Sequence, residues 1–180
     1  LLLDAVEPAL VQTIVTRGAD GHASAQILSR NPAGGEADAW TVHVAANLIR
    51  SGASAAVDAA EPIASAQARC TELSSRDELY AWFSARGITY GERFSCLEQL
   101  WRGDREAIAT LRWPESLSAE TGRYHLHPAI LDSCLQAVVA ALPAIAPDRT
   151  YVPVNIAQVV THAGGAIRWA HARLQPIDAA

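Results

Sequence analysis

An aspartate and a glutamine four residues apart are the strongest candidates for chemistry in this chain. Asp132 and Gln136 lie in a segment whose apolar residues recur at helical spacing, so both side chains share one helix face and can meet. Asp132 falls at the margin of the apolar arc. A carboxyl group partly withdrawn from water can keep its proton and act as a general acid, with the amide holding it in place. The same spacing also fits a surface aspartate that simply bonds to a glutamine.

Other candidate residues carry less weight. His125 and His127 have a spacing that metal ions favour, but no third ligand follows at a matching interval, so we expect no metal site. His127 is instead expected to fix the turn that enters the helix. Cys134 could be a thiol nucleophile, yet it lies inside the apolar stripe, where a thiol usually packs as a small hydrophobic group.

The elements that must position these residues follow from periodicity and breakers. Pro128 stands where proline opens a helix, and Pro143 ends the same apolar pattern. Ser75 and Glu78 have capping-box spacing, which predicts another helix that stops near Gly87. Further strands are expected around these helices, at residues 94–103, 105–113, 151–161 and 167–174.

The first fifty residues read as an antiparallel meander. Three segments with short or alternating apolar patterns, separated by turn-forming residues, predict strands at 10–16, 25–30 and 40–48. Periodicity then disappears into alanine, serine and proline. We therefore expect an α+β chain with one unit at 1–52, a linker at 53–74 and a second unit at 75–180.

Composition limits the possible functions. Half of the residues are hydrophobic, 18% are charged and the net charge is −5, which is typical of a soluble globular protein. No basic patch suggests nucleic-acid binding, and no apolar run suggests a membrane helix. Without a signal-peptide pattern, a cytoplasmic location is expected. The chain contains no methionine, so we interpret it as a piece of a longer protein.

Several motifs together resemble one family. Residues 127–136 (HPAILDSCLQ) resemble the HPxxLDxxxQ signature of dehydratase domains from modular polyketide synthases. Residues 87–94 (GITYGERF) resemble the G-x-x-YGPxF stretch of that family, with Glu92 where the family usually has proline. Residues 100–104 and 152–154 follow in the family's order, so the resemblance runs from about residue 10 to the end.

The resemblance implies a double hot-dog fold, in which two curved antiparallel sheets each wrap around a helix. It also implies a β-hydroxyacyl substrate, carried on the phosphopantetheine arm of an acyl carrier protein, that loses water to give an α,β-enoyl thioester. Asp132 would be the acid, Gln136 would orient it, and Tyr90 would hydrogen-bond nearby. The resemblance further suggests four substrate-contacting residues: Gly91, Phe94, His127 and Pro128.

The family's catalytic base is a histidine in an HxxxGxxxxP motif, and none of the six histidines here is followed by glycine four positions later. We therefore expect the first hot dog to be incomplete, the second to be truncated at its end, and the 180 residues to be inactive alone. Expected partners are the acyl carrier protein, other synthase domains and a second copy of the chain, with no redox cofactor. Two alternatives stay open: a non-catalytic double hot dog that serves dimerisation or carrier docking, and a related domain that guides cyclisation.

Overall fold

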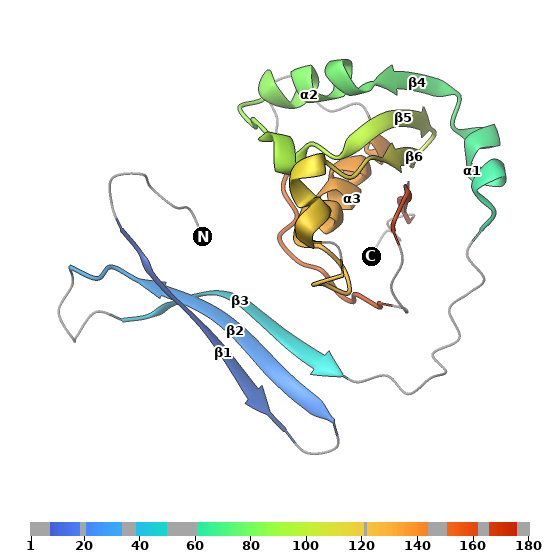
Figure 1. The fold of residues 1–180 in the computed structure, drawn as a ribbon. Helices are drawn as coiled ribbons and strands as arrows, with labels where there is room; N and C mark the ends of the chain where they lie inside the picture. The colour runs from blue at the N-terminus through green and yellow to red at the C-terminus, as the bar shows by residue number, and fades with distance from the viewer. Residues whose placement is uncertain are drawn as a thin grey trace. The chain divides into compact units, whose positions relative to one another are not determined.

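Two units make up the chain, Leu1–Ala59 and Ala60–Ala180, and each is described by itself (Figure 1). The computed structural model describes residues 8–18, 21–33, 39–49, 61–120, 122–143, 151–161 and 166–175. Antiparallel sheets occur in both units, and helices accompany the sheet of the second, so the α+β class expected from the sequence is confirmed. None of the helices in the described ranges is long and apolar enough to cross a bilayer.

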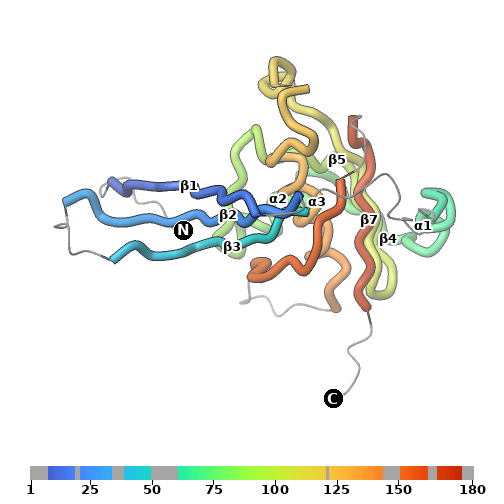
Figure 2. Tube along the Cα trace, turned by 90° about the horizontal axis from the view of Figure 1, so that it is seen from below, coloured from blue at the N-terminus to red at the C-terminus, as the bar shows by residue number. Residues whose placement is uncertain are grey.

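The first unit is a three-stranded antiparallel sheet in the order β1-β2-β3, with the strands side by side in Figure 2. The strands are β1 (Leu10–Arg17), β2 (His22–Arg30) and β3 (Thr41–Ile49), close to the predicted segments. Large apolar side chains stay exposed on it, among them Val15, Val42 and Ile49. Within the described part of this unit no side chain is fully buried.

The second unit has a four-stranded antiparallel sheet in the order β4-β5-β6-β7. Its strands are β4 (Glu72–Ser75), β5 (Leu97–Gly103), β6 (Glu106–Leu111) and β7 (Trp169–Arg173). Helix α3 (Pro128–Ala141) packs against β5, β6 and β7, and α2 (Arg76–Ser84) covers the start of β5 (Figure 1). The main core forms between them, with Phe83, Leu97 and Ile130 almost fully buried.

Helix α3 begins and ends where the sequence predicts. Pro128 is its first residue, and His127 caps it by accepting the main-chain N–H of Ala129. Ile130, Ala137 and Ala141 recur at helical spacing and face the sheet, where they are fully buried.

Helix α2 is fixed at its N-terminus. Ser75 and Glu78 form the predicted capping box, in which the Ser75 N–H donates to Glu78 Oε2 at 2.8 Å. The Arg76 guanidinium then donates to the carbonyls of Ser95 and Leu97, the latter at 3.2 Å. These bonds fasten α2 across the beginning of β5.

The linker predicted at 53–74 is wrong in its second half, because α1 (Ile63–Arg69) and β4 lie there; residues 50–60 are outside the described residues. The fully buried residues here are small: Ala66 of α1 and Cys70 just after it are buried against Ile108 of β6, and Ile63 packs there partly buried. Gly103 permits this close approach, since a Cβ at that position would lie 2.8 Å from the carbonyl oxygen of Arg69.

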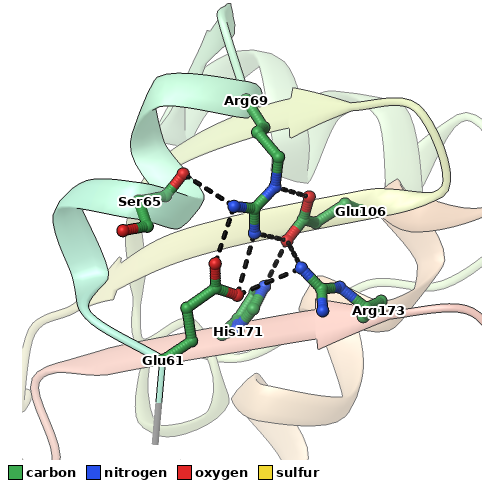
Figure 3. A network of polar contacts seen from close by, with 6 residues as sticks. All are labelled: Glu61, Ser65, Arg69, Glu106, His171 and Arg173. Carbon is green, nitrogen blue, oxygen red and sulfur yellow. Dashed lines mark hydrogen bonds and ion pairs between the residues drawn. The ribbon is translucent and has the colours of Figure 1, made fainter.

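A charged cluster ties α1 to the sheet (Figure 3). Five residues make up this Glu106 cluster: Glu61, Arg69, Glu106, His171 and Arg173. Arg69 donates to both carboxylate oxygens of Glu106, at 2.6 and 2.8 Å, while His171 and Arg173 approach Glu106 at 2.7 and 3.1 Å. The hydrogen bonds from Arg69 are the main cause that lowers the pKa of Glu106 to about 2.

The strand predicted at 151–161 is also wrong. These residues have no regular structure, and all of them are exposed. Val154 is 93% exposed, so the apolar alternation here is not matched by a core. The last predicted strand, in contrast, is confirmed as β7, which pairs with β6.

Candidate active site

The predicted contact between Asp132 and Gln136 is present on α3. Gln136 Nε2 donates to Asp132 Oδ2 at 2.8 Å, across one helical turn. Asp132 is half-buried, whereas the side chain of Gln136 is buried. The carboxyl group therefore lies at the boundary between core and solvent, with Oδ2 bonded to the buried amide of Gln136.

Gln136 is itself held from two further directions. Its Nε2 also donates to the Phe94 carbonyl at 2.9 Å, and its Oε1 accepts the hydroxyl of Tyr80 at 3.1 Å. The Tyr80 oxygen in turn accepts the main-chain N–H of Leu97, also at 3.1 Å. All hydrogen-bonding groups of the amide except one oxygen lone pair are thus used.

The N–H of Leu97 is available to Tyr80 because it points away from β6: the Arg112 N–H bonds to the Cys96 carbonyl, the pattern that flanks a non-hydrogen-bonded pair of Leu97 and Leu111. The β5–β6 register shifts between Leu97, which lies opposite Leu111, and Gln99, which lies opposite Thr110. On the other side of β5, the pairing with β4 reaches only Gln99, opposite Ser75. Sequence reasoning missed Tyr80, because nothing in its spacing links it to residues 56 positions later.

Tyr90 lies near the carboxyl group. Its ring meets those of Phe83 and Tyr80 edge to face, with centroids 5.1 and 6.0 Å apart. Burial raises the pKa of Tyr90, and the negative charge of Asp132 raises it further. The phenol therefore stays protonated and can donate a hydrogen bond, although among the described residues it makes no direct bond to Asp132.

Gly91 and Phe94 contribute through their main chain. Gly91 precedes a short 3₁₀ turn, η1 (Glu92–Phe94), and its carbonyl accepts the Ser95 hydroxyl at 2.9 Å. Glu92, in the position of the family's proline, begins this turn and is exposed. The ring of Phe94 is 43% exposed, while its carbonyl helps to hold Gln136.

His127 fixes the entry to α3, as predicted, while its expected contact with substrate stays a prediction. Its Nδ1 accepts the Ala129 N–H at 3.2 Å, so the ring proton is on Nε2, which lies 3.3 Å from Glu120 Oε2. The ring is buried and packs against Trp113 and Tyr124. Both ring nitrogens are thus engaged by protein groups. Pro128 beside it is exposed.

Cys134 is placed for packing. It contacts the main core, and burial raises the pKa of its thiol to about 11. The nucleophilic thiolate is therefore scarce near neutral pH.

A separate hollow of about 390 Å³ lies between α2 and the end of α3. Its apolar lining includes Trp82 and Phe83 from α2 and Val139 from α3. Val139 is seven residues beyond Asp132, or roughly 10 Å along the helix. The hollow is thus distinct from the surroundings of the carboxyl group.

Comparison with known proteins identifies the family. Residues 58–179 match the family model described as "Polyketide synthase dehydratase N-terminal domain". The chain belongs to the polyketide synthase dehydratase family. Among curated relatives of this dehydratase chain, the spectinabilin polyketide synthase system protein NorA of Streptomyces orinoci is 34% identical over 153 residues. That match covers 84% of this chain but 8% of NorA.

Solved structures agree with this assignment. The dehydratase domain from the CurF module of the curacin polyketide synthase matches with a TM-score of 0.77 and 27% identity, covering 99% of this chain and 63% of that one. The CurK dehydratase also matches, and two of its structures are of inactive mutants, one with histidine replaced by phenylalanine and one with aspartate replaced by asparagine. Each shares 25% identity with this chain, with TM-scores of 0.72 and 0.71, and covers 98% and 97% of this chain and 61% and 60% of the other. The double hot-dog fold expected from the sequence is thereby confirmed.

Proposed function

We propose that this chain forms part of a dehydratase that removes water from a β-hydroxyacyl thioester, with Asp132 as the general acid. The observation that carries the proposal is the hydrogen-bonded pair of Asp132 and Gln136 on α3, within a chain of the dehydratase family. The substrate would be carried on the phosphopantetheine arm of an acyl carrier protein. Loss of water changes no oxidation state overall, so the reaction needs no redox cofactor.

The hydrogen bond from Gln136 assigns different tasks to the two oxygens of Asp132. Oδ2 receives an N–H, so it serves as an acceptor, and the acid proton belongs on Oδ1. In the proposed step, a histidine outside these residues takes the α-proton of the substrate while the bond from the β-carbon to its hydroxyl breaks. Oδ1 delivers its proton to the departing hydroxyl, water leaves, and a double bond forms between the α- and β-carbons.

Two further observations support this reading. Burial raises the pKa of Tyr90, so its phenol stays protonated and can serve as a donor to the substrate hydroxyl. In the related CurK dehydratase, separate inactive mutants lack a histidine and an aspartate, in keeping with a two-residue mechanism. The acyl carrier protein and a second copy of the chain are the proposed partners.

The test is Asp132→Asn in the natural polypeptide that carries these residues. Asparagine keeps the shape but has no acidic proton, so we expect dehydration to fall about 100- to 10,000-fold. Mass spectrometry of the carrier-bound acyl chain measures the loss of water directly. Asp77→Asn, at an exposed position on α2, is the matched control and should keep the parental rate.

Near-parental turnover of Asp132→Asn would show that the acid is elsewhere. If the unchanged polypeptide does not dehydrate any carrier-bound β-hydroxyacyl chain, the non-catalytic double hot dog becomes the better description. Circular dichroism of each variant checks that the fold is retained.

A further inference from the structure

We infer that Tyr80 is a positioning residue for the acid: its hydroxyl fixes the orientation of the Gln136 amide, so that Asp132 is offered an N–H rather than a carbonyl oxygen. The inference rests on the proposed function, because it concerns how that carboxyl group is held. It adds a residue on a different helix to the site.

The directions of the hydrogen bonds follow from main-chain groups that can only donate or only accept. The Leu97 main-chain N–H can only donate, so the Tyr80 oxygen accepts from it at 3.1 Å. The remaining Tyr80 proton then points to Gln136, 3.1 Å away. The atom of Gln136 that accepts a hydroxyl proton must be the amide oxygen, which leaves the NH₂ group for the other side.

The two hydrogens of that NH₂ group have matching acceptors. The Phe94 carbonyl can only accept, and it lies 2.9 Å from Nε2. The second hydrogen goes to Asp132 Oδ2 at 2.8 Å. The amide orientation is therefore set by one fixed donor and one fixed acceptor, both independent of Asp132.

Tyr80 is itself well fixed and stays a donor. It is half-buried, and burial is the largest cause that raises its pKa to about 12, so the phenol keeps its proton at any pH where the protein functions. The Arg76 guanidinium lies 5.1 Å from the ring centroid and also bonds to the carbonyls that flank Cys96. Helix α2 thus presents the hydroxyl to Gln136 from a constrained position.

Removal of the hydroxyl has a defined chemical consequence. Without Tyr80 Oη, the buried Gln136 oxygen loses its donor, and the amide keeps only its bonds to the Phe94 carbonyl and to Asp132 Oδ2. An amide with its oxygen unanchored can turn about the last side-chain bond, which lengthens or misaligns the bond to Oδ2. Asp132 is then held less precisely with respect to the departing hydroxyl.

The experiment compares Tyr80→Phe, Gln136→Leu and the double variant in the natural polypeptide. Tyr80→Phe should lower kcat about 10-fold and change KM less than twofold, because the acid is displaced while substrate binding is not. In the Gln136→Leu background, Tyr80→Phe should cause no further loss in kcat, since its effect passes through the amide. Tyr151→Phe, which removes an exposed hydroxyl, is the control and should keep the parental kcat.

Multiplied losses in the double variant, or a Tyr80→Phe kcat within twofold of the parent, would overturn the inference. A purely structural role for Tyr80 would lower thermal stability and leave kcat per folded molecule unchanged, which also contradicts it. Asp132→Asn, measured in parallel, distinguishes failure of the Tyr80 inference from failure of the proposed function. If that variant is inactive and Tyr80→Phe is normal, only the role of Tyr80 fails; if Asp132→Asn is active, the proposed function fails first.

Discussion

Two carboxylates in the second unit, Glu106 and Asp132, are both held by networks, but the networks differ in kind. Glu106 receives two arginines and a histidine, and the resulting low pKa keeps it ionised throughout the physiological range. Asp132 receives one neutral amide on one oxygen, in a half-buried position. A carboxylate surrounded by cations cannot offer a proton, and the acid role that we propose for Asp132 needs a position without such partners. Position and partner type, rather than residue type, separate the structural role of Glu106 from the role proposed for Asp132.

The largest effect that we expect from this contrast is a loss of stability when Glu106 is changed. Glu106→Gln removes the charge that Arg69, His171 and Arg173 share, so we expect the free energy of unfolding to fall by about 2 kcal/mol. Urea denaturation followed by circular dichroism measures it. The dehydration rate per folded molecule should not change, and a loss of activity without a loss of stability would contradict the structural role.

Acid titration tests the same contrast through pH. The pKa of Glu106 is lowered from 4.5 to about 2, so its contribution to stability is complete above about pH 4.5 and declines as the pH falls towards 2. Urea midpoints measured between pH 3 and 7 should show this decline. In Glu106→Gln this component of the decline should be absent, and an identical pH profile in both proteins would refute the assignment.

The smallest effect concerns the packing of α1 beneath this cluster. Gly103→Ala places a methyl group 2.8 Å from the Arg69 carbonyl oxygen, so the helix must shift away from the sheet. We expect a loss of about 1 kcal/mol in unfolding free energy, at the low end for overpacking because α1 is short. Thermal denaturation is the measurement, with Gly91→Ala, which has open space at its Cβ position, as the matched control.

Whether a feature could be predicted depended on how far apart its interacting residues are in the sequence. Helix α3, its proline start and the Asp132–Gln136 contact all follow from spacings of four residues or fewer. The hold of Tyr80 and Phe94 on Gln136 arises from tertiary packing of α2 and η1 against α3, which local periodicity does not encode.

The apolar patterns gave wrong predictions for two segments, for opposite reasons. Helix α1 is short, and its only fully buried residue is Ala66, which packs with Cys70 against Ile108, so a single large apolar residue, Ile63, gave no periodic pattern to detect. Residues 151–161 contain valines in alternation, yet they lie exposed and form no strand. Apolar residues predict burial only where a partner surface is available.

The early end of β4 has a consequence for how this unit tolerates changes in chain length. The pairing of β4 with β5 stops at Ser75, opposite Gln99, and the Leu97 N–H further along β5 donates to Tyr80 instead of to a strand. An insertion that extended β4 past Leu97 would bring a main-chain carbonyl into competition with the phenol for that N–H. The bonds that run through Tyr80 and Gln136 to Asp132 thus begin where the short strand leaves the sheet edge open.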